Sequence, residues 1–331
     1  MSEALVVEYP EGSEPEVTLD IREVTDAFLG EGDTLIDVTY SSLNYKDAMA
    51  LAGDRGVMRT NPLIPGIDAV GVVTESTSER FQPGDTVVLN GAGLGEFRHG
   101  GYTTRLRVDS ASAVALPEGM TPWEAAAIGT AGYTAALCVL GLLDHGLRPE
   151  DGPVLVTGAT GGVGSIALLL LKKRGFETVA LTGRVAEHGD WLRSLGASAV
   201  EDRAGFVERG RPLQKGRFAG VVDTLGSHAL VNALAQLRWG GVATACGLAQ
   251  GADLPGTVLP FILRGVILQG INSVDAPVVL RERAWDLLAR ELDRDALADL
   301  TETVPLSHVA AAGAELLAGK RHGRAVVDVH A

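Results

Sequence analysis

The sequence of 331 residues contains few cysteines, few aromatic residues and fewer basic than acidic side chains. Its two cysteines, Cys138 and Cys246, lie far apart in apolar stretches, which excludes a disulfide framework and a zinc knuckle. The formal net charge is −14, and the resulting repulsion of phosphate argues against a nucleic-acid partner. An aromatic content of 5% also disfavours base-stacking platforms for single-stranded nucleic acid.

The sequence also lacks the signals of a membrane or secreted protein. We find no uncharged apolar run that approaches the ~18 residues of a membrane span, and so expect no membrane partner. The acidic residues 1–16 have neither the basic start nor the apolar core of a signal peptide. None of the seven histidines stands in an H-E-x-x-H motif or beside a cysteine at a ligand spacing, so we expect no metal. These absences predict a soluble, cytoplasmic, globular protein.

Glycine, by contrast, is abundant: the 331 residues include 42 glycines, which follow no repeat. This is nearly twice the ordinary glycine content of about 7%. The glycines gather between short apolar runs, as expected of a protein with many strand ends and tight turns.

The first part of the chain predicts a β-rich, barrel-like fold. Short runs of β-branched and aromatic residues are separated by turn signals such as Pro65-Gly66 and Pro83-Gly84-Asp85. A helix is expected there only around Tyr45–Leu51. The expected strands are Leu5–Tyr9, Leu35–Tyr40, Val70–Glu75, Thr86–Leu89 and Tyr102–Val108.

From Pro117 onwards the pattern changes. Thr121-Pro122-Trp123-Glu124 predicts a helix start, because it combines a capping Thr, a Pro at the first helical position and a Glu three residues after the cap. A second helix, Tyr133–Leu143, is expected after a break at Gly129–Gly132. Strands and helices then alternate, which predicts a parallel sheet. The strands are Val154–Thr157, Thr178–Leu181, Ala199–Glu201, Val221–Thr224 and Gly241–Cys246, and the helices are Val163–Arg174, Glu187–Leu195 and His228–Gln236.

After residue 265 the sequence predicts a short tail that rejoins the N-terminal part, so that the α/β unit is an insertion. The tail is expected to contain strands at Val266–Ile271 and Ala325–Val329 and helices at Arg281–Glu291 and Leu306–Leu317.

A glycine-rich loop, Gly158–Gly164, follows the apolar strand Val154–Thr157 and opens a helix. Small residues there would let the backbone approach a pyrophosphate at the positive end of the helix. A tight turn is the alternative, but the strand before, the helix after and the further βα units favour a dinucleotide site.

The end of the next strand, Leu181-Thr182-Gly183-Arg184, carries no acidic residue to bind a ribose 2′-hydroxyl. Thr182 and Arg184 are instead suited to a 2′-phosphate, which predicts NADPH as the cofactor. The alternative is an exposed arginine on a solvated loop.

Two polar features interrupt the N-terminal part. Asn44 and Asp47 have the spacing of a helix cap, which is compatible with a role in a site. Asp68 lies inside an apolar run, so it is either a buried, hydrogen-bonded strut or a group with a raised pKa. Composition alone favours the strut.

These motifs together resemble the medium-chain dehydrogenase/reductase superfamily over essentially the whole chain. They are Asn44–Asp47, Pro65–Gly71, Pro83-Gly84-Asp85, Gly129–Ala135 and Gly158–Gly164. Ile67 stands where zinc-dependent members carry a histidine ligand, which is typical of the zinc-free, quinone-oxidoreductase-like branch. The resemblance implies an α/β fold in which a Rossmann nucleotide-binding domain (residues 126–265) is inserted in a β-rich GroES-like barrel domain (residues 1–125 and 266–331).

Within that branch, the sequence is most similar to the NADPH-dependent acrylyl-CoA reductases. The segments that carry the similarity are Ser41–Asp47, Arg211–Lys215, Ala245–Ala249 and Leu259–Arg264, whereas Gly95–His99 departs from the family. The resemblance implies a homodimer that reduces the 2,3 double bond of a short-chain enoyl-CoA, acrylyl-CoA to propionyl-CoA. It implies that NADPH is bound by Tyr45, Thr160, Gly161, Gly162, Val163, Thr182, Gly183, Arg184, Arg203, Leu248, Ile262, Ser273 and Arg324.

In this interpretation Asn44 donates a hydrogen bond to the developing oxyanion, and Tyr45, Asp47 and Asp68 position it or relay a proton. Two alternatives stay open: an NADPH-dependent quinone or enal reductase, and a non-enzymatic NADPH-binding protein. A CoA substrate needs basic side chains for its phosphates, and the candidates are Lys46, Arg55, Arg59 and Arg105.

Overall fold

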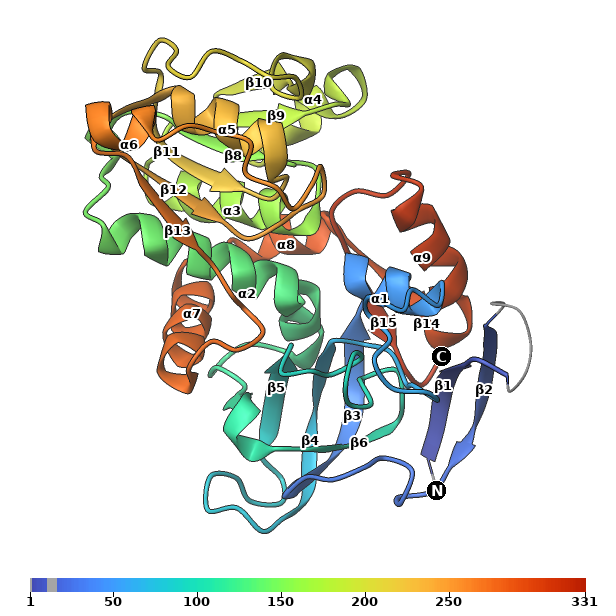
Figure 1. The fold of residues 1–331 in the computed structure, drawn as a ribbon. Helices are drawn as coiled ribbons and strands as arrows, with labels where there is room; N and C mark the ends of the chain where they lie inside the picture. Colours follow the sequence, from blue (N-terminus) through green and yellow to red (C-terminus); the bar gives the residue numbers. More distant parts are fainter. Residues whose placement is uncertain (1, 11–16) are drawn as a thin grey trace. The chain divides into compact units, whose positions relative to one another are not determined.

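The computed structural model describes residues 2–10 and 17–331 (Figure 1), and they form two compact units. One, here called the β unit, combines the chain up to Tyr133 with Ser273–Ala289 and Leu297–Ala331. The other, the α/β unit, combines Thr134–Asn272 with Arg290–Ala296. The α/β unit therefore interrupts the β unit in sequence, as the predicted insertion requires.

A seven-stranded sheet forms the centre of the β unit, with the strand order β14-β15-β3-β4-β5-β7 and with β6 paired to β3. β15 runs antiparallel to β3, with Val326 opposite Ser42, so the C-terminal segment rejoins the N-terminal strands as predicted. β1 and β2 form a separate antiparallel pair. The strands are β1 (Ser2–Glu8), β2 (Thr18–Val24), β3 (Thr34–Ser42), β4 (Asp68–Ser76), β5 (Thr86–Asn90), β6 (Arg105–Val108), β7 (Ala113–Ala115), β14 (Thr301–Pro305) and β15 (Arg324–Asp328).

Burial alternates from Ile36 to Val38 in β3, because successive side chains of a strand point to opposite faces of the sheet. Ile36 and Val38 are buried in one apolar cluster with Val73 and Leu106, whereas Asp37 between them is exposed. A second cluster joins the short helix α1 (Tyr45–Leu51) to α9 (Val309–Leu317).

The helix α2 (Pro122–Asp144) corresponds to the two helices that the sequence predicts around Gly129–Gly132. The two helices meet at a kink at Gly129, whose backbone angles of φ 49° and ψ −162° are not helical. Its start is the expected capping box: the Thr121 N–H donates to Glu124 Oε2 (2.7 Å) and the Glu124 N–H to Thr121 Oγ1 (3.2 Å).

The same helix corrects the expectation that no apolar run is long enough for a membrane span. By length and composition α2 could cross a membrane. However, 89% of the apolar 18-residue stretch of α2 is buried inside the protein. The apolar character of α2 is thus explained by its position as a core helix.

The α/β unit contains a parallel six-stranded sheet with the order β10-β9-β8-β11-β12-β13, as predicted for a nucleotide-binding domain. The strands are β8 (Val154–Thr157), β9 (Thr178–Thr182), β10 (Ala199–Asp202), β11 (Phe218–Asp223), β12 (Leu237–Ala245) and β13 (Ile267–Gly270). Its helices are α3 (Gly162–Lys173), α4 (Val185–Ser194), α5 (Ser227–Ala235) and α6 (Leu259–Arg264). Three helices contribute residues to both units: α2, α7 (Val278–Glu291) and α8 (Arg294–Asp299).

β13 corresponds to the strand expected at Val266–Ile271, at the start of the tail. It pairs in parallel with β12, with Ala243 opposite Leu268, and so belongs to the sheet of the α/β unit. The compact unit therefore continues past residue 265, to Asn272.

Candidate functional site

The glycine-rich loop joins β8 to α3, and the geometry requires two of its glycines, Gly158 and Gly164. Gly158 has a positive φ of 59°, and a Cβ there would collide with the Thr224 hydroxyl. A Cβ on Gly164 would lie 2.6 Å from the Gly158 carbonyl oxygen, so α3 packs closely on the end of the strand. Gly161, before the first turn of α3, is different: a Cβ added there would contact only the Gly158 carbonyl oxygen, at 3.3 Å. The backbone at the start of α3 is therefore open to an anion such as a pyrophosphate.

A buried carboxylate that the sequence analysis did not single out, Asp223, supports this loop. It accepts hydrogen bonds from the Thr157 hydroxyl (2.7 Å) and the Gly226 N–H (2.8 Å), and the Thr157 hydroxyl accepts from the Thr224 N–H (2.9 Å). Burial raises the pKa of Asp223. These bonds tie together the carboxyl ends of β8 and β11. An acid at the end of the apolar run Val221-Val222 was the signal that could have identified it.

Two arginines surround Gly183, which follows the end of β9. The Arg184 guanidinium donates to Thr160 Oγ1 (3.1 Å), and the Arg184 N–H donates to Thr182 Oγ1 (3.2 Å). A Cβ on Gly183 would lie 2.7 Å from Arg203 Nε, so the Arg203 side chain covers this glycine. With Thr182 as its last residue, β9 has no acid at its end. This donor set matches a 2′-phosphate, which accepts several charge-assisted hydrogen bonds.

The other predicted cofactor residues lie in both units. Leu248 and Ile262 belong to the α/β unit and are each 67% exposed, so neither side chain is a core residue. Tyr45, Ser273 and Arg324 belong to the β unit. Tyr45 begins α1 and is 56% exposed, whereas Arg324 at the start of β15 is 4% exposed.

Asp68, at the start of β4, is the centre of a buried polar network in the β unit. It accepts hydrogen bonds from the Asn44 amide (2.8 Å), from the Asn90 amide (2.7 Å) and from the Ser42 hydroxyl. The Thr130 N–H (2.9 Å) and hydroxyl (2.6 Å) also donate to it. At 1% exposure, and with this many donors, Asp68 has the geometry of the buried strut.

Asn44 is fully engaged in the same network. Its Nδ2 group donates to Asp68 and to Asp47 Oδ2 (3.0 Å), and its Oδ1 atom accepts from Arg324 Nη1 (3.1 Å). Its backbone N–H donates to Asp47 Oδ2 at 2.8 Å, which is the helix cap that the sequence predicts. The Asn44 amide therefore faces two carboxylates, and its role in the reaction stays a prediction.

Asp47, which is 1% exposed, is a second buried carboxylate of this network. Burial and then the charge of Asp68 raise its pKa to about 7, although hydrogen bonds from the Ile67 and Asn44 N–H groups oppose this shift. Burial likewise raises the pKa of Tyr102, whose hydroxyl donates to the Ser42 carbonyl oxygen (3.1 Å), well above its ordinary value.

Arg324 brings a positive charge to these carboxylates. Its Nε atom donates to the Ala127 carbonyl oxygen (2.7 Å), whereas Nη2 has no hydrogen-bond partner among residues 2–10 and 17–331. Burial lowers the pKa of Arg324, and Asp68 and Asp47 oppose this shift. The kink of α2 makes room for the guanidinium, because a Cβ on Gly129 would lie 2.5 Å from Nη2 and 2.7 Å from Asp68 Oδ2.

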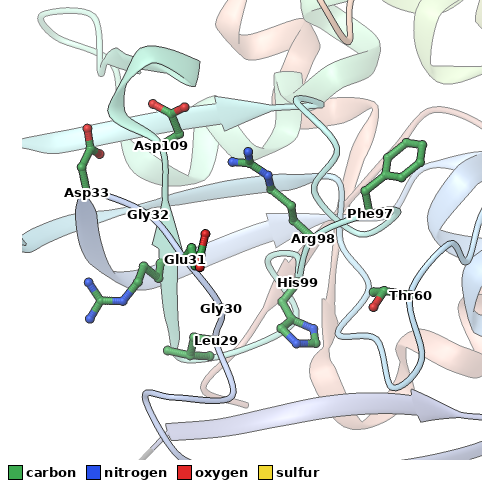
Figure 2. Close-up of a pocket in the computed structure, with 11 residues that line it drawn as sticks. Leu29, Gly30, Glu31, Gly32, Asp33, Thr60, Phe97, Arg98, His99 and Asp109 are labelled. Carbon is green, nitrogen blue, oxygen red and sulfur yellow. The ribbon is translucent and has the colours of Figure 1, made fainter.

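The β unit also has a cavity of about 610 Å³ that contains none of the predicted site residues (Figure 2). Figure 2 shows Asp33 and Asp109 on one side of it and Phe97 and Thr60 on the other. Its lining includes Phe97–His99, part of the segment that departs from the family pattern. Carboxylates and guanidinium groups line it together, so it does not have the single sign of charge expected of an anion site.

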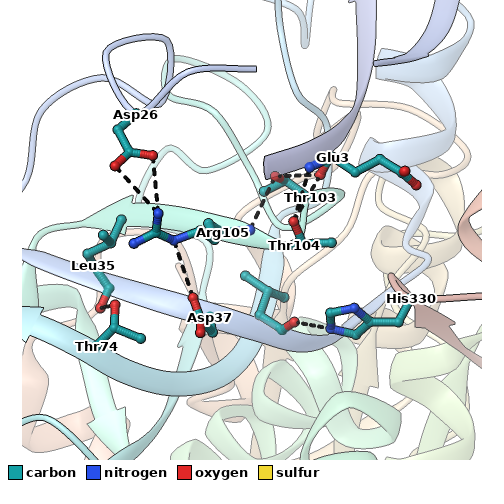
Figure 3. A network of polar contacts seen from close by, with 10 residues as sticks. Glu3, Asp26, Leu35, Asp37, Thr74, Thr103, Thr104, Arg105 and His330 are labelled. Atoms are coloured by element: carbon teal, nitrogen blue, oxygen red, sulfur yellow. Dashed lines mark hydrogen bonds and ion pairs between the residues drawn. The ribbon is translucent and has the colours of Figure 1, made fainter. Parts of the chain in front are cut away.

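Three of the four basic residues expected to serve CoA phosphates have other partners. Arg105 lies 3.3 Å from a carboxylate oxygen of Asp26 and 3.3 Å from one of Asp37 (Figure 3). Lys46 pairs with Glu96 at 2.7 Å, and the Arg55 guanidinium lies over the Tyr9 ring.

The described part of the chain contains no group of three or more His, Cys, Asp or Glu side chains that could hold a metal ion. The lack of a functional metal stays a prediction. The two cysteines are distant only in sequence: the Cys138 and Cys246 thiols are in hydrogen-bond contact, which together with burial raises the pKa of Cys246. Both are free thiols, and the Cys246 thiol also donates to the Asp223 carbonyl oxygen (3.3 Å).

Comparison with known proteins gives matches along the whole chain. A family model described as zinc-binding dehydrogenase matches residues 162–290, and one described as alcohol dehydrogenase GroES-like domain matches residues 30–118. The acrylyl-CoA reductase AcuI of Ruegeria pomeroyi is 45% identical over 332 aligned positions, which cover 100% of both chains.

Two solved structures are similar over 99% of both chains. The yhdH oxidoreductase of Salmonella enterica, in complex with NADP, is 43% identical with a TM-score of 0.95. The yhfP protein of Bacillus subtilis, with NAD bound, is 39% identical with a TM-score of 0.93.

Proposed function

Because the chain belongs to the medium-chain dehydrogenase/reductase superfamily, and within it to the family of the acrylyl-CoA reductases, we propose that it is an NADPH-dependent reductase of a short-chain enoyl-CoA. The proposed reaction converts acrylyl-CoA and NADPH, with one proton, to propionyl-CoA and NADP⁺. The observation that carries the proposal is the nucleotide site of the α/β unit. Its open glycine loop and the guanidinium groups of Arg184 and Arg203 beside Gly183 suit a phosphorylated dinucleotide.

We assign the loop residues Thr160–Val163 to the pyrophosphate and Thr182–Arg184 with Arg203 to the 2′-phosphate. Leu248 and Ile262 are exposed and can offer apolar or backbone contacts to the nicotinamide. Tyr45, Ser273 and Arg324 complete the proposed set from the β unit. When bound, NADPH supplies the hydride that the β-carbon of the enoyl thioester receives.

The residues of the β unit have two tasks in this reaction: they stabilise charge on the thioester oxygen and allow a proton to reach the α-carbon. We propose that Asn44, Asp47 and Asp68 serve these tasks by positioning, because their polar groups bond to one another and to the start of α1. Tyr45 begins α1 and is the exposed polar side chain next to Asn44, so it is our candidate for contact with substrate or cofactor.

A second candidate function is reduction of a quinone or a small enal with the same cofactor. One observation favours it: Lys46, Arg55 and Arg105 already have partners within the β unit and are not free for CoA phosphates.

We further propose that the protein is a cytoplasmic homodimer. β13 is the last strand of the six-stranded sheet, so its outer edge is unpaired within the described residues. Val258 and Leu263, in the segment just before β13, are each more than half exposed.

An isotope experiment tests the proposed reaction. Acrylyl-CoA is incubated with NADPH that carries deuterium at both C4 positions of the nicotinamide. We expect propionyl-CoA with one deuterium at the β-carbon and one solvent hydrogen at the α-carbon. Deuterium at the α-carbon would contradict the proposed chemistry, and a failure to consume acrylyl-CoA would favour the quinone reductase or a non-enzymatic NADPH-binding protein.

A further inference from the structure

Asn90, the last residue of β5, connects two parts of the β unit that carry proposed site residues. It is 2% exposed, and its polar atoms bond in two directions. On one side its Nδ2 group donates to Asp68 Oδ1 at 2.7 Å. On the other side its carbonyl oxygen accepts from Arg281 Nη1 at 2.7 Å, and its Oδ1 atom accepts from Trp285 Nε1 at 3.1 Å.

Arg281 extends this connection to the segment 273–276, which contains Ser273. This buried arginine of α7 donates to the carbonyl oxygens of Ala276 (3.0 Å), Val274 (2.5 Å) and Ser273 (3.4 Å). The same segment packs on the residues after Asn90, because the Ala92 N–H donates to the Val274 carbonyl oxygen (3.2 Å). Asn90 therefore holds Asp68 on one side and, through Arg281, the Ser273 segment on the other.

We propose that Asn90 is a positioning residue for the reaction. Its side chain fixes Asp68, and through Asp68 it fixes Asn44 and the start of α1, against the segment 273–276. This inference rests on the proposed function, because it takes Tyr45 and Ser273 to contact substrate or cofactor. A buried hydrogen-bond network holds its groups in one geometry, and an error of about 1 Å in that geometry can lower turnover about 100-fold.

The contact with Asp68 distinguishes this role from a purely structural one. Asp68 accepts hydrogen bonds from the Asn44 amide and from both the N–H and the hydroxyl of Thr130, the residue after the kink of α2. If Asn90 only satisfied buried polar groups, its loss would lower stability and leave the turnover of the folded protein unchanged. If it positions Asp68, turnover should fall even in fully folded protein.

Two variants of the full chain separate these outcomes. Asn90→Ala removes the bond to Asp68 and keeps the backbone carbonyl that binds Arg281. Trp285→Phe is the matched control, because it removes the other side-chain hydrogen bond of the same amide and leaves Asp68 untouched. For each variant we would measure the melting temperature, the dissociation constant of NADPH, and kcat with acrylyl-CoA and with benzoquinone.

We expect Asn90→Ala to lower kcat by about 10- to 100-fold while the dissociation constant of NADPH changes by less than about threefold. Trp285→Phe should lower the melting temperature and keep kcat within about twofold. Unchanged kcat in folded Asn90→Ala, or an equal loss of kcat in Trp285→Phe, would overturn the inference. If Asn90→Ala does not fold, Asn90→Ser decides in its place by the same criteria.

The choice of acceptors keeps this inference separate from the proposed function. Wild-type protein that reduces benzoquinone and not acrylyl-CoA would refute the proposed substrate, and the comparison of kcat between variants would then be made with benzoquinone. Wild-type protein that reduces neither acceptor would overturn both.

Discussion

The side chains around Gly183 are the residues that should decide between the two nicotinamide cofactors. Arg184 reaches Thr160 of the glycine loop, and Arg203 covers Gly183, at the position where an NAD site would have an acid. The similar yhdH structure holds NADP, whereas the yhfP structure holds NAD, so the choice of cofactor is a property to be tested in this chain.

We predict that Arg184→Ala weakens NADPH binding much more than NADH binding, by about 1–3 kcal/mol for a lost charge-assisted hydrogen bond. Titration of both cofactors into the variant gives the two dissociation constants. Arg193→Ala, which removes an exposed arginine paired with Asp190 on α4, is the control and should change neither constant. Equal losses of NADPH and NADH affinity would refute a contact between Arg184 and the 2′-phosphate.

A second residue, Asp47, should make stability depend on pH. Its pKa is raised to about 7 in the folded protein, from an ordinary value of 3.8. A raised pKa means that the folded state holds the proton more tightly, so the contribution of Asp47 to stability is present below pH 3.8 and is lost as the pH rises through about 7.

We therefore predict that the free energy of unfolding of the wild type falls between about pH 4 and about pH 8 more steeply than that of Asp47→Asn. The amide stays neutral, so the variant loses the proton linkage even though it also loses a hydrogen-bond acceptor. Denaturant unfolding at several pH values measures both slopes. Asp190→Asn, at a fully exposed position, is the control. Identical slopes for wild type and Asp47→Asn would show that Asp47 does not titrate in this range.

At the scale of the element, the kink in α2 is what brings the polar network together. Gly129 has a positive φ, and the space where its Cβ would lie is bordered by Arg324, Asp68 and Ser42. The next residue, Thr130, donates its N–H to Asp68. A residue with a side chain would have to adopt the same backbone conformation and displace a buried guanidinium.

We predict that Gly129→Ala lowers the free energy of unfolding by more than about 2 kcal/mol, from backbone strain and overpacking together. Turnover should fall as well, because Arg324 and Asp68 must move. The control is Gly189→Ala in α4, where a Cβ would meet the flexible end of Arg193 at 3.4 Å and Val185 Cγ1 at 3.9 Å, and where alanine favours the helix. A Gly129→Ala protein as stable as the wild type would contradict the role of the kink.

The elements that the sequence predicts well are those with strong local signals. β8 and α1 have the predicted limits, and α2 begins at its predicted capping box, because apolar runs, caps and turn residues determine them locally. The missed elements have weak local signals. β2 is almost wholly exposed and carries charged residues, and β14 is a short polar strand, Thr301–Pro305, that exists through its pairing with β15.

The candidate site likewise has parts that the sequence predicts and parts that it misses. The glycine loop and the Thr182–Arg184 segment are contiguous in sequence, so a motif can identify them. The roles of Asn90 and Asp223, and the contact between Cys138 and Cys246, depend on residues that only the tertiary fold brings together. For the same reason the sequence could not show that the Asn44 amide donates to Asp47 and Asp68.

At the scale of the whole molecule, the residues of the proposal are divided between the two units. The α/β unit supplies the residues from Thr160 to Ile262, and the β unit supplies Tyr45, Ser273, Arg324 and the network around Asp68. The cofactor assignment can therefore hold even if the substrate assignment fails. The central claim is that a CoA thioester is the preferred hydride acceptor.

The direct test of that claim is kcat/KM for NADPH oxidation with acrylyl-CoA, crotonyl-CoA and benzoquinone, measured side by side on the same preparation. We predict that acrylyl-CoA has the highest value, because binding energy from the remote CoA portion can be used at the reacting carbon. A quinone with a higher kcat/KM than both enoyl-CoA substrates would contradict the account.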